Sequence, residues 1–481
     1  MGGPASLVFR RRSLQSLSPT VGGDSVVPRA SRSLAALLGA APHETAIDPV
    51  ALASWVTRAP PNRTTATPYV GIELDHVMIP PQRHLGGPPA LHEAPAYVRR
   101  ALVAAVDVAL AGVRRVAVAT GGGLDSSVLL GLATEWAKRT GGTAFAIGLD
   151  FEGPGDDRPH LAALERHLGC EVLRVRPEEA APRISLLSEG VDAMPILAAS
   201  VPMEIELYAR ARANGAERVL SGAGGDELFG GSPQSLAEIA WKGHPLRAAH
   251  AARRLTGFGE PSSPAWSWVA RPFLGRLMPA RVRAWRARRQ PAYELPAWFG
   301  PVARSFLEES RRHDDDRAAR LPRDAAQSLA AIRSDPHRVV LAWGRHQEEQ
   351  AAGIDSWDPY LDLDLAAAVI RLPPDYLLFG DTWRGLLRAA AGDLLPHSLR
   401  VRMDKARFEP ALQRFMAAAG GLESLRPLAS GRALAALGLV EPKAFAAAFD
   451  AFAAAPDEGR SWVALWSALS IEAFLRGRGS S

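Results

Sequence analysis

A glycine-rich run, TGGGLDSS at residues 120–127, is the part of the sequence best suited to chemistry. Three consecutive glycines let the backbone turn tightly and bring its N–H groups close to an anion. Ser126 and Ser127 add hydroxyl donors, and a helix beginning here would add the positive potential of its N-terminus. Asp125 would repel a phosphate unless a divalent cation bridged them, which suggests Mg²⁺. The run matches neither a Walker loop nor Gly-x-Gly-x-x-Gly. It predicts a pyrophosphate-binding loop, with a plain glycine turn as the alternative.

A second glycine-rich run, SGAGGDELFGG at residues 221–231, also carries a carboxylate, Asp226. If both runs follow strands of one open parallel sheet, they face the same crevice at its carboxyl edge. Asp125 and Asp226 could then share one Mg²⁺ over a pyrophosphate.

The elements needed to position these loops are visible in the apolar pattern. Short apolar strands alternate with helices, which predicts βαβ units and a parallel sheet. The expected strands are Arg115–Ala119, Ala144–Leu149, Glu171–Val175 and Arg218–Leu220. The expected helices are Tyr97–Leu110, Ser126–Lys138, His160–Leu168 and Pro202–Ala213, and the chain reads as mostly helical after about residue 233.

The two loops resemble segments of the asparagine synthetase family, within the PP-loop ATP pyrophosphatase superfamily. The first resembles SGGxDSS and the second SGEGADELFGG. Further similar segments follow in order over about residues 96–420: Asp156-Asp157, DPYLD at 358–362, LPP at 372–374, WRGLLR at 383–388, LLP at 394–396 and KARF at 405–408. The resemblance implies an α/β fold of the adenine nucleotide alpha hydrolase type. Its parallel sheet is flanked by helices and extended by a mostly helical C-terminal region, with a truncated N-terminal domain.

The resemblance also implies chemistry, because members of this family use ATP and Mg²⁺ to adenylate a carboxylate that an amine then attacks. By this resemblance, pyrophosphate is bound by Gly122, Gly123, Asp125, Ser126 and Ser127, with Gly224 in the second loop, and the metal by Asp125 and Asp226. The backbone around Ala119, Ile147, Ser221 and Gly222 is expected to hold the adenosine. Lys405 is expected to stabilise negative charge on the phosphates and the tetrahedral intermediate, and Asp226 is counted with it as catalytic.

Two positions depart from the family pattern. Gly121 stands where the first loop usually has serine, and Thr120 could partly replace the lost hydroxyl. Ala223 stands where the family has glutamate or another polar residue that handles the amine proton or the substrate. Three explanations remain open: another base such as Glu227 or Asp355, an amine that arrives neutral, or an impaired enzyme.

The source of the amine is a separate question. The resemblance implies that family members fed by glutamine begin with a cysteine, whose thiolate hydrolyses glutamine in an N-terminal domain of about 200 residues. This sequence has one cysteine, Cys170, which falls near the third expected strand and reads as a core thiol. We therefore expect no glutaminase here and an amine that comes from the substrate.

Relatives of that kind include β-lactam synthetases and lasso-peptide macrolactam cyclases. The residues after the second loop and the ending LW…EAFLR look more like the cyclases, so a peptide macrolactam cyclase is the first expectation. Its partners would be a peptide or small-molecule carboxylate, with a leader-binding protein and a protease of the same pathway. Asparagine synthesis, a β-lactam synthetase-like ligase and a non-catalytic ATP-binding scaffold remain alternatives.

The composition and net charge of the chain limit the kinds of partner to expect. The chain has 481 residues, 47% hydrophobic and 22% charged, and a formal charge of +5, so neither nucleic acid nor a membrane is an expected partner. We expect a poorly ordered leader at 1–43, an N-terminal remnant at 44–95 and a synthetase domain at 96–476, with its α/β core at 96–232 and helical part at 233–476. A cytoplasmic location is expected. The arginine-rich stretch 242–289 could be a solvated surface, a site for an acidic peptide or, least favoured, for RNA.

Overall fold

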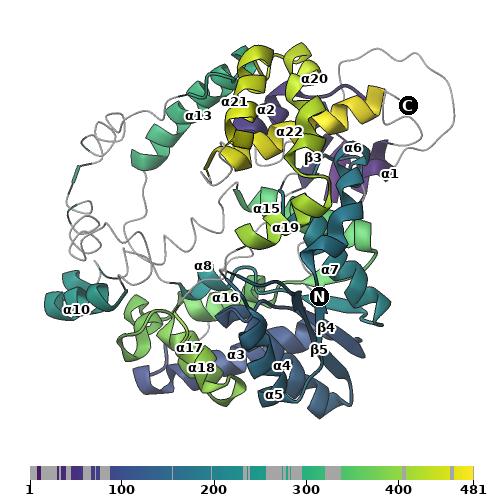
Figure 1. The fold of residues 1–481 in the computed structure, drawn as a ribbon. Helices are drawn as coiled ribbons and strands as arrows, with labels where there is room; N and C mark the ends of the chain where they lie inside the picture. The colour runs from purple at the N-terminus through teal and green to yellow at the C-terminus, as the bar shows by residue number, and fades with distance from the viewer. Residues whose placement is uncertain are drawn as a thin grey trace.

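The computed structural model describes most of the chain from residue 87 onward and short pieces before it. The described residues are 8–11, 30–31, 34–38, 45–57, 67–70, 72–75, 87–153, 155–196, 198–230, 236, 239–255, 274, 278–279, 282, 295–319, 337–403, 408–454 and 460–479. In Figure 1 the sheet and its helices form the lower part of the molecule, and α2, α13, α20, α21 and α22 form the upper part.

A five-stranded sheet of order β6-β5-β4-β7-β8 organises the lower part. All neighbouring strands are parallel. The strands are β4 (Arg115–Ala119), β5 (Thr143–Leu149), β6 (Val172–Val175), β7 (Arg218–Leu220) and β8 (Asp355–Trp357). The predicted α/β class is confirmed. Strand β8 was not expected, because three residues of sequence DSW carry no apolar pattern.

Helices cover both faces of this sheet, and successive residues of β4 show how. Val116 and Val118 pack into one core and Ala117 into another, as the two-residue period of a strand requires. The first core is completed by α3 (Ala94–Ala109), α4 (Leu124–Thr140), α5 (Arg158–Leu168), α8 (Gly225–Phe229), α16 (Leu363–Ile370), α17 (Gly385–Ala391) and α18 (His397–Arg400). The second core is completed by α7 (Val201–Ala213), with α15 (His337–Ala352) packed against it.

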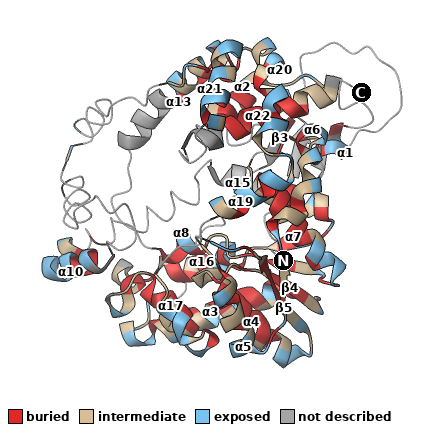
Figure 2. Ribbon diagram, viewed as in Figure 1, coloured by how far each residue is buried: buried red, intermediate tan, exposed pale blue. Residues whose placement is uncertain are grey.

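The predicted helices agree with α3, α4, α5 and α7 to within three residues at either end. Burial on both faces explains why the strands read as continuous apolar runs rather than alternating ones. Figure 2 shows the buried residues concentrated in the sheet and on the inner sides of these helices.

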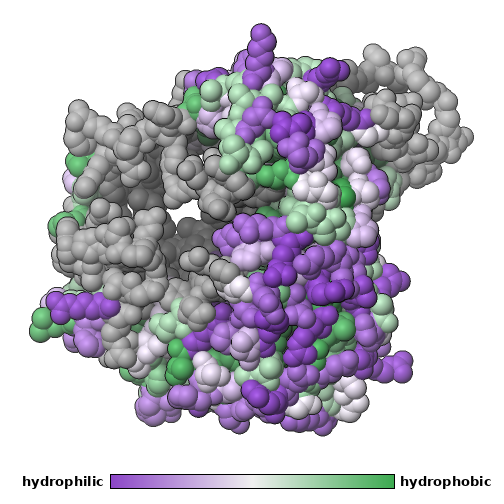
Figure 3. All heavy atoms as spheres, in the orientation of Figure 1, coloured by the Kyte–Doolittle hydropathy of each residue, from purple (hydrophilic) through white to green (hydrophobic). Residues whose placement is uncertain are grey.

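A separate, mostly helical core forms the upper part of the molecule. It contains α1 (Leu34–Leu38), α2 (Pro49–Thr57), α6 (Leu186–Glu189), α13 (Pro301–Ala319), α19 (Glu409–Ala418), α20 (Arg432–Ala436), α21 (Pro442–Ala454) and α22 (Arg460–Gly479). The helix α10 (Pro245–Leu255) packs beside residues 374–381 in the lower part. Figure 3 shows hydrophilic residues over the lower right of this face, around α4 and α5.

The N-terminal pieces take part in the fold. β1 (Val8–Arg11) pairs antiparallel with both β2 (Ala30–Ser31) and β3 (Ile72–Asp75). Leu34 in α1 is fully buried in the upper core. Within residues 1–43 the structure describes only β1, β2 and α1, so the poorly ordered leader expected there stays a prediction. The domain boundaries at 43 and 95 stay predictions. Among the described helices none is both long and apolar enough to cross a membrane.

Candidate functional site

The first glycine loop joins β4 to α4 at the carboxyl edge of the sheet. Gly122 has a φ of 73°, in the left-handed region that favours glycine. A Cβ added there would lie 2.5 Å from the Cβ of His160, so the backbone also runs too close to α5 for a side chain. Gly123 is the extended N-cap residue, and α4 begins at Leu124. The strand–turn–helix geometry predicted from the sequence is present.

Three hydroxyl groups organise this loop. Thr120 Oγ1 accepts a hydrogen bond from the Gly122 N–H at 3.0 Å and lies 2.9 Å from Ser126 Oγ. Thr120 therefore supplies a hydroxyl inside the loop, as expected from the missing serine at 121. Ser127 is fully buried in the first turn of α4, and its Oγ has no hydrogen-bond partner among the described residues. A buried hydroxyl at a helix N-terminus is suited to an anion.

The space that a side chain at 121 would occupy is filled by a carboxylate. A Cβ on Gly121 would lie 2.5 Å from Asp157 Oδ2. Asp157 is 4% exposed, and its Oδ1 lies 3.2 Å from Nη1 of Arg402, which also donates to the Gly122 carbonyl at 3.1 Å. A serine at 121 would therefore require the Asp157 carboxylate to move.

The second loop lies directly against the first. A Cβ on Gly222 would be 3.0 Å from the Ser126 nitrogen, and one on Gly225 would be 2.5 Å from Cγ of Asp125. Gly224, with a φ of 88°, leads into α8, which carries Asp226. The contact follows from the topology, because β4 and β7 are parallel neighbours whose carboxyl ends meet.

Asp125 and Asp226 are brought together by an arginine. Arg384 is 6% exposed, and its Nη1 lies 3.0 and 2.8 Å from the two carboxylate oxygens of Asp125. Its Nη2 forms an ion pair with Asp226 Oδ1. On the other side, the Tyr360 hydroxyl donates to the Asp125 carbonyl at 2.9 Å, and burial raises the pKa of Tyr360 well above its usual value. Both carboxylates therefore contact one cation, the Arg384 guanidinium.

This arrangement fits a magnesium–phosphate group. Mg²⁺ takes one or two carboxylates and completes its shell with phosphate oxygens and water, so Asp125 and Asp226 meet its needs. In the described part of the chain no cluster of three or more His, Cys, Asp or Glu residues that could hold a metal ion occurs. The orphaned Ser127 hydroxyl and the loop glycines fit the phosphates.

The other predicted site residues take varied positions. Ala119 ends β4 beside Ile147 of β5, and the Ile147 carbonyl accepts from the Thr120 N–H at 2.8 Å. The Ile147 side chain is fully buried in the core, so only its backbone could face a ligand. Ser221 follows β7 directly. Lys405 lies outside the described residues, although Arg388 donates to the carbonyls of Arg400 and Arg402 just before it. The assigned ligand contacts of these residues stay predictions.

One candidate base is excluded by the topology. Asp355 pairs in register with Arg218 at the start of β7, whereas the glycine loops follow the opposite ends of the strands. It lies at the amino edge of the sheet and is exposed there. The prediction of Asp355 as a base is therefore wrong, and Glu227 in α8 remains. Cys170 is buried in the core, as predicted, and burial raises its pKa.

Sequence reasoning missed several residues at this site: Asp157 as the neighbour of Gly121, together with Arg345, Asp358, Arg384 and Arg402. Arg384, Asp157 and Asp358 stand inside segments that resemble the family, which was the available signal. Asp157 and Gly121 are 36 positions apart, and the contacts of Arg345 with Ser221, of Arg384 with Asp125 and of Arg402 with Asp157 join segments more than 100 residues apart.

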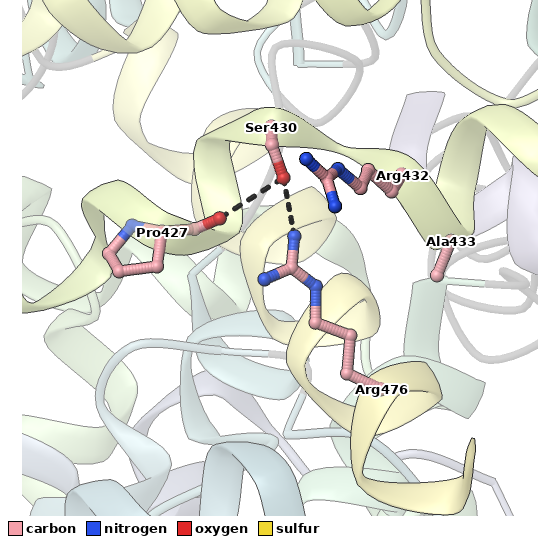
Figure 4. Close-up of a pocket in the computed structure, with 5 residues that line it drawn as sticks. All are labelled: Pro427, Ser430, Arg432, Ala433 and Arg476. Atoms are coloured by element: carbon pink, nitrogen blue, oxygen red, sulfur yellow. Dashed lines mark hydrogen bonds between the residues drawn. The ribbon is translucent and has the colours of Figure 1, made fainter. Parts of the chain in front are cut away.

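A cavity of about 660 Å³ lies away from the glycine loops, in the upper part of the molecule (Figure 4), lined by Pro427, Ser430, Arg432, Ala433 and Arg476. Arg476 donates to Ser430 Oγ at 2.5 Å and to Glu472 at 2.7 Å. Glu472 is fully buried and accepts from the backbone at the start of α20. These contacts tie α22 to α20, so the cavity's main polar groups are structural.

Comparison with known proteins adds one positive finding. The model of the family described as asparagine synthase matches residues 97–476, which is most of the chain. No curated protein sequence matches at the significance required. Members of the matched family are carbon–nitrogen ligases, generally AMP-forming, that use ATP, generally with Mg²⁺. The two glycine loops, Asp125 and Asp226 all lie inside the matched region.

Proposed function

The chain belongs to the asparagine synthase family of ATP-dependent amide ligases, and from this premise we propose that its amine comes from the substrate itself. The best candidate reaction is closure of a peptide macrolactam, in which an Asp or Glu side chain of a peptide is joined to the peptide's own N-terminal amine. Synthesis of asparagine and a β-lactam synthetase-like reaction are the alternatives within the family.

The observation that supports this proposal most is the burial of the one cysteine in the sequence, Cys170. Hydrolysis of glutamine by a cysteine nucleophile needs an accessible thiolate. The sequence has one cysteine, Cys170, which is 7% exposed. Burial raises the pKa of its thiol, which disfavours the thiolate. This chain therefore offers no thiol suited to releasing ammonia from glutamine.

The chemistry would take place where the two loops meet. In the first step a carboxylate oxygen attacks the α-phosphorus of ATP, giving an acyl-adenylate and pyrophosphate. In the second, the amine attacks the acyl carbon, AMP leaves with the bond electrons, and the amine loses one proton. Mg²⁺ held by Asp125 and Asp226 would supply charge neutralisation at the phosphates. The N-terminus of α4 and the hydroxyls of Ser126 and Ser127 would orient the phosphates.

A peptide substrate is favoured by the surroundings of Arg384. α10 packs through Ala248 and Ala251 against Leu378 and Trp383, the residue before Arg384. The segment from Lys242 to Leu255 has basic side chains and no acidic one. Several of these basic residues are exposed: Lys242, His244, Arg247, His250 and Arg253. Arg247 is within 3.8 Å of Asp375, and because α10 packs in one cluster with Trp383, this basic segment would attract an acidic peptide toward the residues next to Arg384.

The test is product analysis with defined substrates. The protein is incubated with ATP, Mg²⁺ and a panel of peptides that carry a free N-terminal amine and an internal Asp or Glu. The proposal predicts peptide-dependent release of AMP and pyrophosphate and a peptide product lighter by one water. Asp125→Asn and Asp226→Asn are expected to abolish both. Asp107→Asn is the matched control, because Asp107 forms an exposed ion pair with Arg139 between α3 and α4.

Other outcomes decide between the alternatives. AMP formation with free aspartate and ammonium, but with no peptide, would replace the macrolactam proposal by asparagine synthesis. AMP formation with a small β-amino acid alone would favour the β-lactam type. Tight ATP binding without pyrophosphate release, for every substrate and Mg²⁺ concentration, would favour a non-catalytic scaffold.

A further inference from the structure

The hydroxyl of Ser221, at the start of the second loop, is fully used inside the protein. It donates to Asp358 Oδ1 at 2.6 Å and accepts from Arg345 Nη2 at 2.7 Å and from the Ala223 N–H at 3.2 Å. A serine hydroxyl has one proton and two acceptor lone pairs, so these contacts leave none for a ligand. The Ser221 side chain therefore links segments of the protein and is not available to a nucleotide, and its backbone N–H donates to the Trp357 carbonyl at 3.1 Å.

Arg345, in α15, is the cation of this hydrogen-bond network. Its Nη1 lies 2.8 Å from Glu348 Oε2 and also contacts the Tyr208 hydroxyl, while its Nη2 lies 3.4 Å from Asp358 Oδ1. The guanidinium carbon lies 5.5 Å from the centre of the Tyr208 ring. A planar guanidinium can hold several partners at fixed angles, which a lysine ammonium cannot.

The carboxylates around Arg345 stabilise its charged form. Burial acts to lower the pKa of Arg345, but the carboxylates led by Asp358 and Glu348 outweigh it and raise the pKa above its usual value. Burial raises the pKa of Glu348 well above its usual value, and the nearby Glu204 adds to the rise. Removing one member of such a buried network leaves another without its counter-charge, which is costly.

This hydrogen-bond network holds the part of the second loop that faces the first glycine loop. Ser221 Oγ holds the Ala223 N–H, Gly224 follows with its left-handed φ, and α8 then carries Asp226 toward Asp125. We propose that Arg345 and Asp358 are positioning residues that, through Ser221, hold this loop in the conformation that binds ATP. This inference rests on the proposed function, because it assigns the loop to a nucleotide.

The experiment compares Ser221→Ala, Ser221→Thr and Asp358→Asn with wild type and with the control Asp107→Asn. ATP binding is measured by calorimetry, and ATP kinetics by pyrophosphate release. Loss of a hydrogen bond to a charged group predicts an ATP Kd and KM higher by about 10- to 100-fold in Ser221→Ala and Asp358→Asn. Ser221→Thr keeps the hydroxyl and is expected to return both values toward wild type.

The readouts separate positioning from general stability. A purely structural role would lower the folded fraction and hence kcat, with KM for ATP unchanged, and that result would overturn the inference. So would equal ATP Kd values in wild type, Ser221→Ala and Asp358→Asn. If the variants bind ATP more weakly but wild type forms no AMP, the proposed function fails and the positioning role stands. If wild type binds no ATP, both fail.

Discussion

Asp157 lies next to Gly121, the most unusual residue of the first loop. Its carboxylate occupies the volume next to Gly121 and is held there by Arg402. The serine usual at 121 in this family would need that volume. The polar side-chain atoms beside this position belong to Asp157 and Thr120.

Gly121→Ser is therefore expected to impair the site although it restores the family residue. Overpacking of about 1–3 kcal/mol on the loop corresponds to a loss of about tenfold or more in ATP-dependent pyrophosphate release. Gly87→Ser is the control, because nothing lies within 4 Å of a Cβ added at Gly87. Activity of Gly121→Ser equal to or above wild type would contradict this account.

Arg384 supplies the shared cation of Asp125 and Asp226. Arg384→Met removes that charge, so the two carboxylates are expected to attract Mg²⁺ more strongly in the absence of nucleotide. A ligand that binds only the folded state raises its stability, so Mg²⁺ should raise the Tm of this variant more than that of wild type. The control is Arg139→Met, from the exposed pair with Asp107. Equal Mg²⁺ responses in Arg384→Met and wild type would refute the prediction.

At the scale of elements, the site depends on how closely two loops approach. The parallel pairing of β4 and β7 places both turns at one edge, and the absence of side chains at Gly222 and Gly225 lets the second loop contact the start of α4. At Gly222 the nearest atom is the Ser126 backbone nitrogen, and at Gly225 it is the Asp125 side chain. The close approach therefore involves both the backbone at the start of α4 and the Asp125 carboxylate.

Gly222→Ala tests that contact. The added Cβ would lie 3.0 Å from the Ser126 nitrogen and 3.3 Å from Asp125 Cβ, which forces the loops apart by a few tenths of an ångström. We expect weaker ATP binding and pyrophosphate release lowered by about tenfold, with little change in the circular dichroism spectrum. Gly87→Ala should behave as wild type. Unchanged ATP affinity in Gly222→Ala would show that the close approach is not required.

At the scale of the molecule, Tyr69 and Arg478 join the N-terminal pieces to the last helix. Arg478 in α22 donates to the Tyr69 hydroxyl at 2.7 Å and to the Thr45 carbonyl at 3.2 Å, and its guanidinium carbon lies 5.1 Å from the centre of the Tyr69 ring. Tyr69 donates to the Ala193 carbonyl at 2.7 Å. Four segments distant in sequence are thus held at one point.

This junction predicts a pH dependence of stability. Burial raises the pKa of Tyr69 from 10.0 to about 12, although Arg478 opposes the rise. Below pH 10 the phenol is neutral in both states, and between about pH 10 and 12 mainly the unfolded state loses the proton, so stability falls as the pH rises. A shift of this size corresponds to about 2–3 kcal/mol. Denaturant unfolding of wild type should show this loss and that of Tyr69→Phe should not; equal pH dependence in both would contradict the assignment.

The sequence was sufficient for the elements with a strong apolar pattern and for the loops between them. β4, β7 and α4 could be predicted because strands buried on both faces and glycine turns leave local signals. β8 could not, since its three residues are stabilised by their neighbour β7 rather than by their own pattern. The contact of Arg384 with Asp125 spans 259 positions, and no local spacing encodes such a contact. The topology was enough to predict that Asp125 and Asp226 lie at the same edge of the sheet. It did not predict that both would contact the Arg384 guanidinium.

The most direct test of the account is the identity of the nucleotide products formed with a peptide that carries a free N-terminal amine and an internal Asp or Glu. Wild type and Asp125→Asn are compared by chromatography of the adenine nucleotides together with a pyrophosphate assay. The account predicts equal amounts of AMP and pyrophosphate from wild type, dependent on the peptide, and none from Asp125→Asn. Formation of ADP and phosphate, or AMP formation that Asp125→Asn leaves unchanged, would contradict it.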